Sequence, residues 1–127
     1  MSGNQRLAFH GKHGTWDCYA KTREDAQQIV FYSICPTTAP TEKHAAVAEF
    51  ITRANYGLII GNFELDFSDG EIRYKTSLDI EGDRLTPALV KQLVYANVLT
   101  LDQYLPGILA VIEGSSSPEE AIAAVEP

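Results

Sequence analysis

Residues 56–85 constrain the fold of this chain more than any other segment of its sequence. On both sides of Asp69-Gly70, apolar residues alternate with polar ones, which is the pattern of two strands joined by a tight turn. A two-residue type I′ turn at this dipeptide places apolar pairs on one sheet face and opposite charges on the other. The predicted register pairs Leu65 with Tyr74, Asp66 with Arg73, and Glu64 with Lys75. The apolar face of the first strand should carry Ile59, Gly61, Phe63, Leu65 and Phe67.

Further strands and helices are predicted on either side of this hairpin. Strands are expected at residues 7–10, 15–22 and 28–35, and helices at 40–55, from Pro87 to Gly114, and from Pro118 on, with residues 1–6 frayed. Asn55 or Gly57 should end the first helix in the left-handed conformation. Pro106 should kink the second helix near Asp102 or divide it around Thr100. The order β-β-β-α-β-β-α-α indicates an α+β domain, with an antiparallel sheet of about five strands under helices on one face.

Composition and charge narrow the classes of partner. A chain of 127 residues fits one domain, residues 1–127. The net charge of -7 and the scattered basic residues disfavour nucleic acid and anionic membranes as partners. The first residues lack the apolar core of a signal peptide, and the longest aliphatic run, 108–112, is too short to span a bilayer. We therefore expect a cytoplasmic protein with neither a nucleic-acid nor a membrane partner.

No set of residues points to catalysis or to a bound cofactor. Cys18 and Cys35 match no metal or redox spacing, and a reducing cytoplasm favours two buried thiols, although the predicted strands would also allow a disulfide. His10 and His13 lie three residues apart in a turn near Asp17, which is a weak metal pattern without a third placed ligand. We expect no enzyme activity, no metal and no cofactor.

The candidate binding residues lie on or beside the predicted helices and in the hairpin. Asn97 falls inside the apolar stripe of the second helix, so its buried amide needs a partner. Arg53 and Asn55 end the first helix, where they either satisfy backbone groups or face a groove. The residues predicted to bind a partner or a ligand are Arg53, Asn55, Tyr56, Tyr74 and Tyr95.

Several stretches carry a resemblance to a known family. They are Arg53-Ala-Asn-Tyr-Gly-Leu-Ile-Ile-Gly-Asn-Phe-Glu-Leu-Asp, Asp69-Gly-Glu-Ile-Arg-Tyr-Lys-Thr-Ser-Leu-Asp, Gly82-Asp-Arg-Leu-Thr, Asp102-Gln-Tyr-Leu-Pro-Gly-Ile and Ser117-Pro-Glu-Glu-Ala-Ile. Over about residues 15–126 the chain resembles the YbjN domain family. The resemblance implies a bacterial protein of a family often labelled a sensory-transduction regulator. It also implies a fold similar to that of type III secretion chaperones.

The resemblance also carries expectations about assembly and function. Family members usually begin with a helix, and only 14 residues precede Thr15, so we expect either that this helix is missing or that the chain is a shortened version. An uncovered sheet face would then favour a homodimer. The chaperone-like fold implies a non-enzymatic module that holds or regulates another protein through a sheet edge or a groove between helix and sheet. The alternative is a small-ligand-binding regulatory domain with a pocket near Arg53, Tyr74 and Tyr95.

Overall fold

The computed structural model describes residues 2–23, 25–80, 82 and 85–127. Its elements follow the predicted order β-β-β-α-β-β-α-α, with a short 3₁₀ turn before the first helix. The strands are β1 (Ser2–His10), β2 (Thr15–Arg23), β3 (Gln28–Ile34), β4 (Asn62–Leu65) and β5 (Ile72–Asp79). The 3₁₀ turn is Thr41–Lys43, and the helices are α1 (His44–Gly57), α2 (Pro87–Glu113) and α3 (Pro118–Val125).

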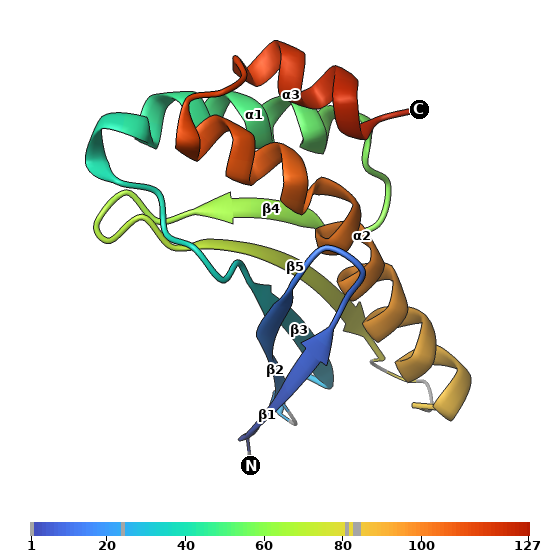
Figure 1. Ribbon diagram of the computed structural model, residues 1–127. Coiled ribbons are helices and arrows are strands. Elements are labelled where there is room, and N and C mark those ends of the chain that lie inside the picture. Colours follow the sequence, from blue (N-terminus) through green and yellow to red (C-terminus); the bar gives the residue numbers. More distant parts are fainter. Residues whose placement is uncertain (1, 24, 81, 83–84) are drawn as a thin grey trace.

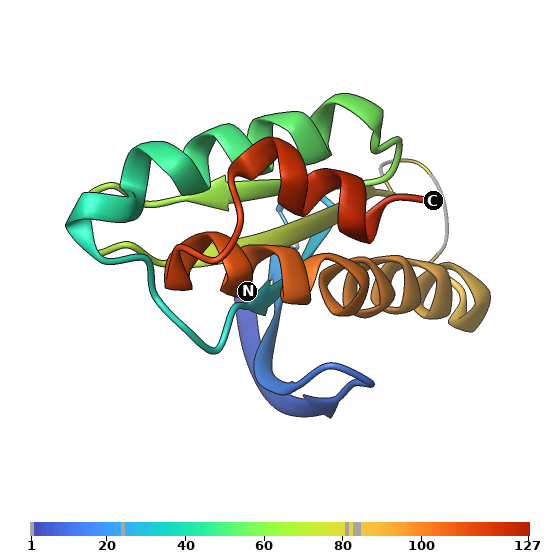
Figure 2. The same cartoon turned by 45° about the horizontal axis from the view of Figure 1, so that its top comes forward.

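The strands form one antiparallel sheet in the order β1-β2-β3-β5-β4. The helices lie together on one face, with α1 over β4, α2 crossing β3 and β5, and α3 resting on α1 and α2 (Figure 1 and Figure 2). The β1–β2 hairpin extends beyond this helical layer (Figure 1). The α+β class, the antiparallel sheet and the helices on one face are therefore confirmed.

Strand β1 is longer than the sequence suggested. It begins at Ser2, so the prediction that residues 1–6 are frayed was wrong for residues 2–6. The strand pairs with β2 along its whole length, from Ser2 opposite Arg23 to His10 opposite Thr15. Backbone pairing with β2 explains the difference, because it orders a stretch whose own residues carry little strand propensity.

The β4–β5 hairpin keeps the predicted faces but not the predicted register. Leu65 lies opposite Ile72 instead of Tyr74, and Glu64 lies opposite Arg73. The pairing has therefore moved by two residues. A shift of two leaves every side chain on its original face, so the alternation of apolar residues could not distinguish the two registers.

A wider turn accounts for the shifted register. The Asp66 carboxylate accepts hydrogen bonds from the Ser68 N–H at 2.8 Å and from its hydroxyl at 2.6 Å. The Gly70 N–H donates to the Asp66 carbonyl at 2.7 Å, and Gly70 has a φ of 80°. This loop replaces the two-residue turn, and Phe67, predicted on the apolar face, is 63% exposed.

Helix α1 buries the predicted face but ends differently. It ends at Gly57, and Leu58 follows in an extended conformation, with its N–H donating to the Asn55 carbonyl at 3.2 Å. The prediction that Asn55 or Gly57 would be left-handed was wrong, because neither has a positive φ. The buried residues of α1 are Val47, Phe50, Ile51 and Ala54.

Helix α2 is one helix, and Pro106 lies inside it. Figure 1 shows that it changes direction along its length but is not divided. Thr86 caps its start, where the hydroxyl accepts from the Leu89 N–H at 3.2 Å, and Gly114 ends it with a φ of 80°. A capping box formed by Ser117 and Glu120 starts α3.

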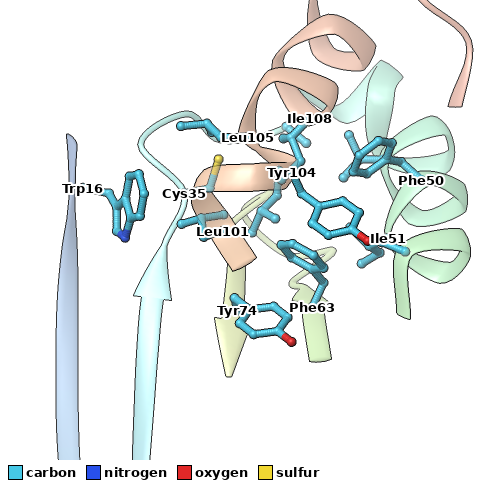
Figure 3. Close-up of a cluster of buried hydrophobic side chains, with 14 of the residues drawn as sticks. Trp16, Cys35, Phe50, Ile51, Phe63, Tyr74, Leu101, Tyr104, Leu105 and Ile108 are labelled. Atoms are coloured by element: carbon cyan, nitrogen blue, oxygen red, sulfur yellow. The ribbon is translucent and has the colours of Figure 1, made fainter. Parts of the chain in front are cut away.

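The hydrophobic core lies between the helices and the sheet (Figure 3). The ring of Phe63 in β4 is centred 4.7 Å from that of Tyr74 in β5 and 5.5 Å from that of Tyr104 in α2. Tyr104 also meets Phe50 of α1, with ring centres 6.3 Å apart. These edge-to-face contacts are a favoured arrangement of aromatic rings, and they join two strands to two helices.

Asn97 is fully buried in α2, as its place in the apolar stripe predicted. Its amide nitrogen lies 2.9 Å from the Phe31 carbonyl, 3.1 Å from the Tyr74 carbonyl and 3.1 Å from the Thr76 hydroxyl. The Thr76 hydroxyl donates in turn to the Leu93 carbonyl at 3.0 Å. Because these strand acceptors belong to β3 and β5, Asn97 ties α2 to two adjacent strands.

Candidate functional site

Three large apolar side chains project into solvent, one from the last turn of α1 and two from the loop between α1 and β4. Tyr56 is 96% exposed, Ile59 93% and Ile60 59%. We call these three residues the loop surface. Soluble proteins seldom expose adjacent large apolar groups unless something binds there. Sequence reasoning had placed Ile59 and Ile60 in a strand, whereas β4 begins only at Asn62.

The loop surface is held in place by hydrogen bonds at its base. The Tyr74 hydroxyl donates to the Ile60 carbonyl, and the Asn55 side chain bonds to the main chain of Phe63. Gly61 has a φ of 80°, and a Cβ at this position would collide with the Lys75 carbonyl. The loop therefore has a defined conformation despite its exposed side chains.

Asn55 satisfies backbone groups, which was the first of its two predicted roles. Its amide donates to the Phe63 carbonyl at 3.1 Å, and its oxygen accepts from the Phe63 N–H at 2.7 Å. β4 is the last strand of the sheet, so these groups lie on its outer edge. Asn55 thus forms the hydrogen bonds to the Phe63 backbone that a neighbouring strand would otherwise form.

A second exposed apolar strip lies on α2. Tyr95 is 51% exposed and Leu99, one helical turn later, is 59% exposed. The Lys91 ammonium lies 5.6 Å from the centre of the Tyr95 ring. Leu99 borders a groove of about 510 Å³ whose other lining residues are His13, Asp102, Gln103, Pro106, Ala124 and Val125.

The groove and the loop surface lie at the same end of the molecule. Figures 1 and 2 both show the end of α3 beside the α1–β4 loop, with α2 next to it. Gln103 of α2 donates to the Val125 carbonyl at 3.0 Å, and the Tyr104 hydroxyl donates to Glu126 at 2.7 Å. These bonds fix the end of α3 against α2.

The structure does not gather the five predicted binding residues into one pocket. Tyr56 and Tyr95 are exposed, whereas Tyr74 is fully buried and supports the loop from inside. Arg53 lies on the surface, where it pairs with Glu49 at 2.8 Å and with Glu119 at 3.9 Å. Sequence reasoning missed Ile59, Ile60 and Leu99. For the two isoleucines, the glycines at 57 and 61 on either side were a usable loop signal.

The sheet face opposite the helices is polar. Glu64 accepts hydrogen bonds from Arg73 at 2.7 Å and from Lys75 at 3.0 Å, and the Arg73 guanidinium lies 4.3 Å from the centre of the Tyr32 ring. Burial pushes the pKa of Glu64 upward, but the hydrogen bonds and charges of Lys75 and Arg73 outweigh it and lower the pKa. These contacts form the ion-paired face that the alternating charges predicted.

The histidines that suggested a metal pattern have other partners. His10 Nδ1 lies 3.1 Å from the Thr15 hydroxyl, and Asp17 binds Arg6 at 3.0 Å. His13 Nδ1 donates to the Asp102 carbonyl at 2.8 Å. Across residues 2–23, 25–80, 82 and 85–127, no three His, Cys, Asp or Glu side chains are grouped as metal ligands.

Both cysteines are buried and unbonded to each other. The Cys18 sulfur lies 3.4 Å from the Ser33 hydroxyl. Burial raises the pKa of Cys18, and it raises the pKa of Cys35 to about 11. A thiol with a raised pKa is a poor nucleophile near neutral pH, so neither cysteine is activated in this structure.

Comparison with known proteins identifies the family to which this chain belongs. The family model "YbjN: Putative bacterial sensory transduction regulator" matches residues 2–110, which include the whole sheet, α1 and most of α2. No curated protein and no solved structure matches the chain. The similarity to type III secretion chaperones therefore stays a prediction. In the part of the chain that the structure describes, no helix is long and apolar enough to cross a membrane.

Proposed function

The chain belongs to the YbjN family, and from this premise we propose that it is a non-enzymatic regulatory module that holds another protein. The observation that carries the proposal is the loop surface. Tyr56, Ile59 and Ile60 are exposed to water, yet their loop is fixed by hydrogen bonds at its base. A rigid apolar projection loses little conformational freedom when a partner covers it.

The chemistry of the loop surface favours a protein partner. Tyrosine and isoleucine offer apolar area, and an exposed tyrosine also keeps a hydroxyl that can form a hydrogen bond at the rim of an interface. Neither phosphate backbones nor anionic lipids suit a chain with a net charge of -7. We infer that Tyr56 and Ile59 are the principal anchors, because they expose the largest fractions of their side chains.

The strip on α2 extends this surface. Leu99 and Pro106 border the groove from α2, while Ala124 and Val125 border it from α3. The end of α3, which carries Ala124 and Val125, lies beside the α1–β4 loop (Figure 1), so a partner segment that contacts Tyr56 and Ile59 could extend to that border of the groove. Helix docking into a groove is a known mode of peptide recognition.

The test compares proteins captured from the native cell extract by three forms of the chain. The test variant is Tyr56→Ser/Ile59→Ser, and the matched control is Phe67→Ser, which removes an apolar side chain that is 63% exposed on a different loop. We expect the wild type and the control to recover the same partner and the double variant to lose it. All three should have the same melting temperature, because the changed side chains are exposed.

Two results would contradict the proposal. One is the recovery of no specific protein by the wild type. The other is an unchanged set of captured proteins when Tyr56 and Ile59 are both replaced. A catalytic activity found in the purified chain would separately refute its non-enzymatic character.

The second candidate function is a small-ligand regulator. One observation favours it, because the groove of about 510 Å³ between α2 and α3 falls within the size range of ligand pockets. A thermal-shift screen with metabolites separates the two functions. A saturable rise in melting temperature that Leu99→Asp abolishes would support a ligand site, and a flat response would leave only the protein-binding function.

A further inference from the structure

The two outer strands of the sheet differ in whether the backbone groups on their outer edges have hydrogen-bond partners. β4 has 4 residues, and Asn55 closes its edge at Phe63. β1 has 9 residues, and no described residue range forms a strand on its outer side. Its sequence contains no proline and one charged residue, Arg6, so it has few of the features that prevent pairing with another chain.

The turn that joins β1 to β2 shows which backbone groups face outward. The Gly11 N–H donates to the Gly14 carbonyl at 2.8 Å, so these two residues form a hydrogen-bonded pair. Hydrogen-bonded and non-hydrogen-bonded pairs alternate along an antiparallel ladder. In the observed register, Phe9 opposite Trp16 and Leu7 opposite Cys18 are therefore hydrogen-bonded pairs. The N–H and C=O groups that point away from β2 belong to Asn4, Arg6, Ala8 and His10.

We propose that β1 pairs antiparallel with β1 of a second copy of this chain, about a two-fold axis at Leu7. In this register Arg6 lies opposite Ala8 of the second copy, and Asn4 lies opposite His10. Each of these pairs joins outward-pointing backbone groups and exchanges two N–H···O bonds. The two sheets become one continuous sheet, with no change within either monomer.

Side chains select this register from its neighbours. An axis at Ala8 would separate the two copies of Leu7, and an axis at Arg6 would place two guanidinium groups opposite each other. Like charges opposite each other are destabilising. With the axis at Leu7, two leucines that are each 45% exposed cover one another at a non-hydrogen-bonded pair, where side chains are closest. Arg6 keeps its ion pair with Asp17 at 3.0 Å.

This dimer leaves the loop surface free. Figure 1 shows β1 at the end of the sheet away from α1, α3 and the α1–β4 loop. The inference is therefore independent of the proposed function. If both hold, each dimer presents two loop surfaces.

Disulfide trapping tests the register. In the proposed dimer the two Cα atoms of residue 7 are about 4.5 Å apart, which a disulfide can bridge. Leu7→Cys should therefore cross-link under mild oxidation. The matched control is Gln5→Cys, on the same face of β1, whose two copies would be roughly 14 Å apart and should not cross-link. The native cysteines are buried and should not contribute.

Analytical ultracentrifugation tests the assembly itself. The wild type should reach twice the monomer mass of 14.0 kDa. Ala8→Arg brings a second guanidinium opposite Arg6 at both symmetry-related positions and should weaken the dimer about tenfold, whereas the neutral Ala8→Gln should dimerise like the wild type. Ala8 lies opposite Asp17 within the monomer, so a positive charge there favours the folded chain. A wild-type mass of 14.0 kDa at every concentration would overturn the proposal. So would a dimer that Ala8→Arg leaves unchanged and that Leu7→Cys fails to cross-link.

Discussion

Asn55 and Phe63 form two hydrogen bonds that replace a missing strand at the outer edge of β4. The Asn55 amide donates to the Phe63 carbonyl at 3.1 Å and accepts from its N–H at 2.7 Å. Seven positions along the chain separate the two residues, and the loop surface lies between them. The same contact therefore closes the sheet edge and fixes the base of the loop surface, which includes Tyr56 and Ile59.

Replacing Asn55 tests this double role. Asn55→Ala leaves the N–H and C=O of Phe63 partly buried without partners, so the free energy of unfolding should fall by about 1–3 kcal/mol. Urea denaturation gives the value. Arg53→Ala is the matched control on the same helix, because its exposed ion pairs contribute only about 0–1 kcal/mol. Equal losses in the two variants would contradict the assigned role of Asn55.

Pro106 leaves one backbone carbonyl of α2 without its helical hydrogen-bond donor, and His13 donates a hydrogen bond to that carbonyl. A proline has no N–H, so the carbonyl of Asp102, four residues earlier, lacks its helical donor. His13 Nδ1 lies 2.8 Å from that carbonyl and must be the donor, because a carbonyl only accepts. The Asp102 carboxylate also accepts from the N–H groups of Lys12 and His13, at 3.0 and 2.8 Å.

A double-mutant cycle tests this link between the hairpin turn and the helix. His13→Ala should lower stability more in the wild type than in a Pro106→Ala background, where a helical N–H can serve the Asp102 carbonyl. The expected coupling is about 0.5–1.5 kcal/mol, the usual net contribution of a hydrogen bond. Chemical denaturation of the four proteins measures it. A coupling of zero would show that the His13 ring does not compensate for the proline.

Acid should weaken the ion-paired face of the sheet. Burial raises the pKa of Glu64, but the hydrogen bonds and charges of Lys75 and Arg73 outweigh this effect, so the net pKa lies below its ordinary value. The unfolded chain then binds the proton more readily. The stabilisation is fully present above the unfolded pKa of about 4.3 and is lost as pH falls through the lower folded pKa.

Denaturation between pH 7 and pH 3 measures this effect. The wild type should lose more stability than Glu64→Gln as pH falls below about 5. A residual slope should remain in the variant, because hydrogen bonds from the Ser68 hydroxyl and N–H lower the pKa of Asp66 as well. Identical pH profiles for wild type and variant would show that Glu64 does not couple protonation to folding.

The two thiols should react only when the chain unfolds. Burial raises the pKa of Cys35 to about 11 and also raises that of Cys18, so little thiolate exists at pH 8. A thiol reagent such as Ellman's should label the native protein slowly and the urea-unfolded protein at once. Ile59→Cys, at a position whose side chain is 93% exposed, supplies an exposed thiol for comparison. Rapid native labelling of Cys18 or Cys35 would disprove their inertness.

Local signals in the sequence predicted the parts of the fold that depend on neighbouring residues. Thr86 and Ser117 cap their helices, and Gly114 ends α2, because caps use hydrogen bonds within a single turn. The period-two pattern also predicted which side chains of β5 are buried, including Tyr74. Asn97 was recognisable as a buried polar residue from its position in an apolar stripe.

Features that depend on distant partners were predicted less well. The hairpin register was wrong by two residues, since an even shift preserves the apolar face while the Asp66–Ser68 bonds favour a wider turn. The start of β1 was missed because its order comes from β2. Among the predicted binding residues, Tyr56 and Tyr95 are exposed, whereas Tyr74 is buried. Ile59 and Ile60 were predicted to lie in a strand and were therefore missed as surface residues.

The kind and order of the elements follow from local sequence signals, because periodicity and caps act over one or two turns of chain. The tertiary structure alone decided which apolar residues remain outside. Ile59 and Phe63 both belong to a run of alternating residues, yet only Phe63 meets the rings of Tyr74 and Tyr104. Exposure depends on what the rest of the fold places opposite a side chain, and that is settled only when helices and sheet pack together.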